Sequence, residues 1–125
     1  MHDAVGDAGD ARRHVALVGL SGTGKTALAL ALAAEIGAAR VELYTGPYYD
    51  GSIGVDRYAA TAEKAVSCGV MVNAGHDLDL QNLARFLQIK AIQEVSIGHA
   101  LMVECIEQGM PAVVKQYLQI CSESA

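Results

Sequence analysis

Short apolar runs alternate with longer segments of helical periodicity along most of this chain. The runs predicted to be strands are residues 14–20, 40–44, 70–73 and 94–97. The segments predicted to be helices are residues 25–36, 57–68 and 80–87, a stretch that ends near residue 108, and residues 112–120. Strands that alternate with helices at this spacing favour right-handed crossovers and a parallel sheet. The predicted fold class is therefore α/β.

The first predicted helix carries a regular apolar stripe. Leu28, Leu32 and Ile36 recur every four residues, which places them on one side of the helix, and Gly37 is its expected stop. Because the segment is also rich in alanine, we expect this helix to be buried. Residues 1–11 show no such periodicity, so we expect a flexible leader followed by a single domain at residues 12–125.

Composition excludes several classes of protein. The formal net charge is -5 and no basic stripe is present, so nucleic acid is not an expected partner. No apolar run approaches the roughly 20 residues that cross a bilayer, so a membrane is not an expected partner either. The three cysteines show no CxxC spacing, which favours reduced thiols and a cytoplasmic protein over a disulfide framework or a zinc site.

A glycine-rich turn after the first predicted strand has the GxxxxGKT spacing of a phosphate-binding P-loop. In such a loop the backbone amides and the amino end of the following helix stabilise phosphate, the lysine contacts the β- and γ-phosphates, and the threonine hydroxyl binds magnesium. The expected cofactor is ATP or another nucleoside phosphate with magnesium, or else inorganic phosphate. The predicted phosphate-binding residues are Gly19, Ser21, Gly22, Thr23, Gly24, Lys25 and Thr26, of which Thr26 is the metal ligand.

Phosphate transfer requires more than this loop. A Walker-B aspartate should follow an apolar strand and hold the magnesium ion, and no strand of the chain ends in that way. We therefore expect a phosphate- or nucleotide-binding protein with little or no catalysis. A small P-loop kinase or NTPase is one alternative, and a folding scaffold that binds nothing is another.

Three further motifs, in order, carry a resemblance to a known family. They are the segments GAARVELYTGPY (residues 37–48), VNAGHDL (72–78) and EVSIGHAL (94–101). Together they resemble pyridoxine 5'-phosphate synthase, a TIM-barrel enzyme of vitamin B6 synthesis. The resemblance implies that Glu42 stabilises the transition state, that His76 acts as an acid, and that Gly98 with His99 binds substrate phosphate. It implies a second candidate function, that of a fragment of this transferase.

The two sets of motifs together suggest a chimera, natural or engineered. Residues 14–36 would be the P-loop element, and residues 37–120 would come from the carboxyl-terminal part of the synthase. Four to five βα units are too few to close a TIM barrel. We expect an open, doubly wound, P-loop-like sandwich; the alternative is a TIM half-barrel that closes only as a homodimer.

Overall fold

The computed structural model describes residues 3–4, 12–17 and 25–125, which form one five-stranded sheet with helices around it. In chain order the elements are β1 (Asp3–Ala4), β2 (Arg12–Leu17), α1 (Lys25–Glu35), β3 (Ala38–Tyr44), α2 (Gly46–Tyr49), α3 (Val55–Ser67), β4 (Met71–Gly75), α4 (Leu83–Phe86), β5 (Ile92–Ser96), α5 (His99–Gln108) and α6 (Met110–Ser124).

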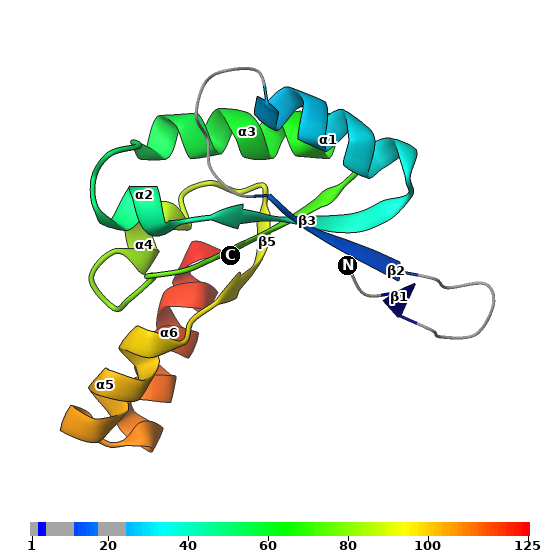
Figure 1. The fold of residues 1–125 in the computed structure, drawn as a ribbon. Coiled ribbons are helices and arrows are strands. Elements are labelled where there is room, and N and C mark those ends of the chain that lie inside the picture. Colours follow the sequence, from blue (N-terminus) through cyan, green and yellow to red (C-terminus); the bar gives the residue numbers. More distant parts are fainter. Residues whose placement is uncertain (1–2, 5–11, 18–24) are drawn as a thin grey trace.

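The sheet has the order β1-β2-β3-β4-β5, so that each strand lies beside its neighbour in the chain (Figure 1). Strands β2 to β5 are parallel, and β1 adds a short antiparallel pairing to Arg12 and Arg13. This pairing places β1 inside the segment expected to be a flexible leader. An α/β fold with a parallel sheet is confirmed.

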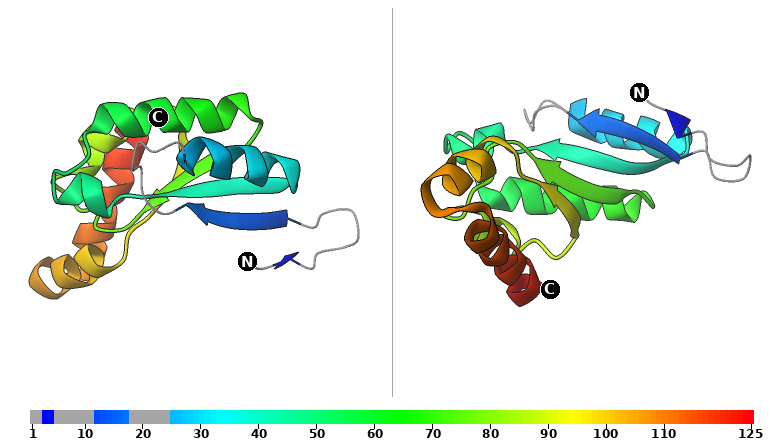
Figure 2. Two further views of the ribbon diagram at one scale, coloured as in Figure 1. Left: turned by 45° about the horizontal axis from the view of Figure 1, so that its top comes forward. Right: turned by 90° about the horizontal axis from the view of Figure 1, so that it is seen from below.

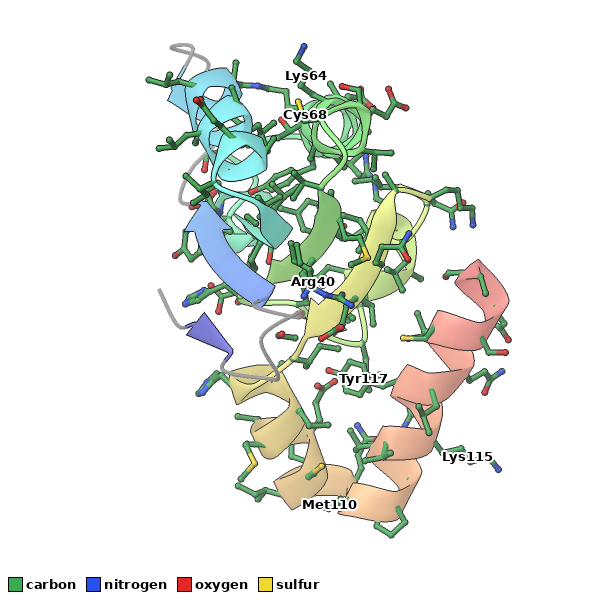
Figure 3. The ribbon with its side chains drawn as sticks, turned by 90° about the vertical axis from the view of Figure 1, so that its right-hand side faces the viewer. Arg40, Lys64, Cys68, Met110, Lys115 and Tyr117 are labelled. Atoms are coloured by element: carbon green, nitrogen blue, oxygen red, sulfur yellow. The ribbon has the colours of Figure 1, made fainter. Side chains whose placement is uncertain are left out.

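Alternation along the strands divides the sheet into two unlike faces. Val41 and Leu43 of β3, with Val72 and Ala74 of β4, are buried under the helices. Helices α1 and α3 cover this face (Figures 1 and 3). They contribute Leu30, Ala33, Tyr58, Ala62 and Ala65 to the core, and α4 and α6 add Leu83, Phe86, Val113 and Tyr117. The other face, which we call the bare face, carries polar side chains at the intervening positions.

The apolar stripe predicted to bury α1 faces the solvent instead of the core. Leu28 is 72% exposed and Leu32 is 56% exposed, whereas Leu30 and Ala33 are buried. Alanines flank the buried positions, and their small side chains let α1 lie close to the sheet. Leu28 and Leu32 therefore lie on the outer surface. Periodicity alone cannot tell whether an apolar stripe faces the core or the solvent.

The strand order does not support the open, doubly wound sandwich. Such a sheet reverses its strand order at a switch point and has helices on both faces. Here the order runs from β2 to β5 without reversal. Helices α5 and α6 pack on each other as a hairpin beyond the carboxyl end of β5 (Figure 2). The observed sheet is consistent with the half-barrel alternative.

Element boundaries follow the sequence pattern closely where the periodicity is long. The main differences are the short helix α2, which was not predicted, and α4, which is four residues long within the predicted helix at 80–87. In the described part of the chain, no helix is long and apolar enough to cross a bilayer.

Candidate functional site

The candidate site lies where β3, β4 and β5 end, because parallel strands bring their carboxyl ends to one edge of the sheet. The register places Glu42 beside Asn73, and it places Tyr44 beside Gly75. Gly75 in turn pairs with Ser96 of β5. Three of the motifs found in the sequence therefore meet at this edge.

Glu42 lies on the bare face, directly against the backbone of β4. A side-chain carbon added to Gly75 would be 3.2 Å from Oε1 of Glu42 and 3.3 Å from Cβ of Ser96. These separations are tighter than ordinary van der Waals contact, so glycine is what allows the carboxylate to approach the neighbouring strand. The carboxylate is thereby held at the junction of all three strands.

His76 follows β4 in a strained turn. Its φ is 98°, and that of Asp77 is 57°, values that side-chain-bearing residues rarely adopt. Hydrogen bonds from other segments hold both carbonyls: the Thr45 hydroxyl donates to the His76 carbonyl, and Nδ2 of Asn82 donates to the Asp77 carbonyl at 2.9 Å. This loop is thus held in place by neighbouring elements, as positions with left-handed strain require.

The imidazole of His76 is oriented from two sides. Its ring centroid is 4.7 Å from that of Tyr44, at an interplanar angle of 56°. Nδ1 lies 2.8 Å from Oδ2 of Asp77. A carboxylate accepts hydrogen bonds, so this contact favours the tautomer with the proton on Nδ1, in which Nε2 faces a ligand. The side chain is 57% exposed, which makes this nitrogen accessible.

His99 occupies the first turn of α5, after Gly98, and both residues are exposed. It borders a hollow of about 360 Å³ between α5 and the loops that follow β3 and β4. Neither Glu42 nor His76 lines this hollow. Its lining residues are Tyr49, Asp79, Gln81, His99, Ala100, Val103 and Glu104.

An aromatic cluster beneath the site fixes the loops. Tyr48, Tyr58 and Phe86 contact one another at ring-centroid distances of 5.1 to 6.1 Å. The Tyr58 hydroxyl donates to the Tyr44 carbonyl at 2.7 Å, and the Tyr48 hydroxyl donates to the Asn82 carbonyl at 2.8 Å. Burial raises the pKa of both phenols, that of Tyr58 to about 12. The neutral, hydrogen-bonding form of each tyrosine is therefore favoured.

Comparison with known proteins identifies the family. Residues 23–123 match the model of the family described as Pyridoxal phosphate biosynthesis protein PdxJ. The chain belongs to the PdxJ family.

Its curated relatives carry the name pyridoxine 5'-phosphate synthase. The protein of Rhizobium meliloti (strain 1021) is 46% identical over 105 residues, which are 78% of this chain and 42% of that protein. The protein of Agrobacterium fabrum (strain C58) is 44% identical over 100 residues, which are 74% of this chain and 40% of the relative. The chain thus spans about two fifths of the length of these relatives.

The match gives no support to a P-loop segment or a chimera. It begins at Thr23, inside the GxxxxGKT motif, and runs across the junction that the chimera hypothesis places between residues 36 and 37. Residues 19–24, which include Gly19, Ser21, Gly22, Thr23 and Gly24, lie outside the described part of the chain. Lys25 and Thr26 are the first residues of α1, as predicted. Phosphate and magnesium binding by this segment stays a prediction.

One polar cluster on the bare face was not predicted. A single nitrogen of Arg40, Nη1, donates to Oδ1 of Asn73 at 3.1 Å and to Oε2 of Glu94 at 3.2 Å. These residues come from β3, β4 and β5, so the guanidinium spans the three strands. The available signal was the two-residue spacing between Arg40 and Glu42, which puts both side chains on one face of β3. The partner residues lie more than 30 positions away and give no local pattern.

Replacing Gly46 by alanine tests how the site orients His76. A side-chain carbon at this position would be 2.6 Å from Cζ of Tyr44, so the ring must move, although the backbone of Gly46 itself accepts alanine. We expect the Tyr44 ring to leave His76, with a changed imidazole chemical shift in the NMR spectrum and a melting temperature close to that of the parent. Gly54→Ala, where an added carbon meets nothing within 4 Å, is the matched control. Unchanged His76 resonances in Gly46→Ala would contradict this role of Tyr44.

Proposed function

We propose that this chain forms the carboxyl-terminal half of a pyridoxine 5'-phosphate synthase-type barrel and binds a phosphorylated small molecule at the carboxyl edge of its sheet. The observation that carries the proposal is the convergence of Glu42, Gly75 and Ser96 at one point, from three strands that all lie within the family match. The proposed class of ligand, a phosphorylated small molecule, comes from the relatives' name, pyridoxine 5'-phosphate synthase.

Each candidate residue has a role that suits its position. Glu42, held against β4, would stabilise positive charge that develops in a bound substrate. His76, whose Nδ1 is bonded to Asp77, would offer Nε2 for proton transfer. Gly98 and His99, at the amino end of the ten-residue helix α5, would bind phosphate through the backbone amides and the imidazole.

The strand order supports the half-barrel as the finer description of the fold. In a (β/α)8 barrel, consecutive parallel strands are neighbours, the helices lie outside, and the active site is at the carboxyl ends of the strands. Strands β2 to β5 follow this order, and α1 and α3 lie on the face away from Arg40 (Figure 3). The bare face then corresponds to the inside of the barrel.

Ligand binding is the direct test of this function. We expect inorganic phosphate and pyridoxine 5'-phosphate to raise the melting temperature, and His99→Ala to weaken calorimetric binding by roughly 10- to 100-fold, as for loss of a charge-assisted hydrogen bond of about 1.5–3 kcal/mol. Gln119→Ala, an exposed change on α6, should leave the affinity unchanged. Equal affinities in His99→Ala and the parent would refute the proposed phosphate site.

ATP with magnesium should be included in the same experiment. A melting shift with ATP that is lost in Lys25→Ala would favour the P-loop prediction instead. A shift with pyridoxine 5'-phosphate that depends on His99 and not on Lys25 favours the synthase-type site. The two variants change different ends of the fold, since Lys25 begins α1 and His99 begins α5.

A further inference from the structure

The outer edge of β5 has no partner among the described strands. β5 pairs with β4 on one side only, in a sheet where the other parallel strands have a neighbour on each side. A strand edge of this kind presents unpaired amides and carbonyls, which natural proteins cover, pair or shorten. Between β5 and the end of α6 lies a hollow of about 460 Å³. Much of its lining is apolar, from Leu87, Ile89, Ile92, Val95 and Cys121.

The bare face carries polar side chains that are linked across three strands. Arg40 links Asn73 and Glu94 across three strands, and Glu42 lies one level nearer the carboxyl edge. The ion pair between Arg40 and Glu94 already neutralises one of the two carboxylates. When the bare faces of two copies approach each other, Glu94 is therefore already paired, and Glu42 is the one acidic residue of this cluster that brings an uncompensated charge.

The opposite end of the sheet offers a matching edge. β1 pairs only with Arg12 and Arg13, so residues 14–17 of β2 have no partner among the described strands on that side. A twofold axis parallel to the strands would set β5 of each copy beside β2 of the other, in the parallel sense. Twice four parallel strands is the number in a closed (β/α)8 barrel.

We propose that two copies of this chain pair through the free edges of β5 and β2 and enclose the two bare faces between them. This inference rests on the half-barrel geometry and not on the proposed phosphate ligand. It places the Glu42 and His76 of each copy at the mouth of a shared enclosure, open at the carboxyl edge. Each site then borders residues of the second copy.

Gln93 provides a selective way to block this edge. The register between β4 and β5 shifts there, so that Ile92 pairs with Val72, Glu94 pairs with Asn73, and Gln93 has no counterpart on β4. Its side chain is exposed and lines the hollow. Proline at this position removes the amide of a residue that has no counterpart on β4, and it disrupts an added strand.

Analytical ultracentrifugation and hydrogen exchange of the full chain test the pairing. We expect a dimer at high protein concentration, and amides on the outer edge of β5, among residues 93–96, that exchange more slowly as the concentration rises. Gln93→Pro should weaken the dimer by about tenfold or more, as expected for the loss of edge pairing, whereas Gln93→Ala should not. Circular dichroism of each variant shows whether it has kept its fold.

Other surfaces could also associate, and Ile106→Lys distinguishes them. Ile106 on α5 is 81% exposed and lies among other exposed apolar residues of the α5–α6 hairpin. Our proposal predicts that this variant remains a dimer. A chain that is monomeric at every concentration would overturn the proposal. So would a dimer that Ile106→Lys dissociates, or one whose β5 amides exchange at a rate independent of concentration.

Discussion

Replacement of Phe86 by alanine is expected to lower the free energy of unfolding by about 3–5 kcal/mol, the range for truncating a buried aromatic side chain. Phe86 has no exposed surface, and its ring contacts both Tyr48 and Tyr58. The cavity left by the ring would lie beside Tyr48 and Tyr58, whose hydroxyls bond the carbonyls of Asn82 and Tyr44. Since natural domains are stable by only about 5–15 kcal/mol, this one change should leave the variant marginally folded.

Urea unfolding followed by circular dichroism measures the loss. The matched control is Leu118→Ala on α6, where the side chain is 65% exposed and the change should be within about 0.5 kcal/mol. If Phe86→Ala were as stable as Leu118→Ala, the aromatic cluster would not be the support that the contacts indicate. A smaller loss of unfolding free energy together with weaker phosphate binding would show that the aromatic cluster mainly positions the loops of the candidate site.

Alkaline pH is expected to destabilise the fold steeply between pH 10 and pH 12. Burial raises the pKa of Tyr58 from 10.0 to about 12, so the folded state favours the neutral phenol. The unfolded chain releases this proton first. The stabilisation is therefore fully present below pH 10 and is lost as the pH rises towards 12, at about 1.4 kcal/mol per pH unit. Burial also raises the pKa of Tyr117, which adds to the same trend.

Tyr58→Phe separates this titration from general alkaline effects. The variant keeps the ring but loses the hydrogen bond to the Tyr44 carbonyl, so it should be less stable at neutral pH by about 1 kcal/mol. Above pH 10 its stability should decline less steeply than that of the parent. Urea midpoints measured across this range give both slopes, and parallel curves would show that Tyr58 does not titrate as its burial requires.

Much of the fold could be predicted from the sequence because its elements are long and periodic. The strands around Glu42 and Asn73 and the helices that begin at Lys25 and His99 were found close to their observed positions. The sequence did not predict which side of α1 is buried. Leu30 and Leu32 are equally apolar, and only tertiary packing decides which of them faces the core. The short helix α2 depends on backbone contacts that leave no periodic signal.

The candidate site was predictable in its residues but only partly in its arrangement. The resemblance indicated Glu42, His76 and His99, and a parallel sheet brings the carboxyl ends of its strands to one edge. The sequence could not show that Gly75 lets the Glu42 carboxylate reach β4. Nor could it show that His99 lines a hollow that Glu42 and His76 do not border. The family match gives no support to the P-loop interpretation, and phosphate binding by residues 19–26 stays a prediction because residues 19–24 lie outside the described part of the chain.

The sequential strand order has a consequence for how the chain reaches its folded state. Each strand pairs only with a strand adjacent to it in the sequence, so the sheet can grow from one side by adding one βα unit at a time. Each parallel pairing still spans an intervening helix, which makes it slower to form than a hairpin, but the order suits assembly as a ribosome releases the chain. Helix α6, which carries Val113 and Tyr117 into the core, would dock last. The growing sheet always has its newest strand at an open edge, and this edge is the one most exposed to misassembly during synthesis.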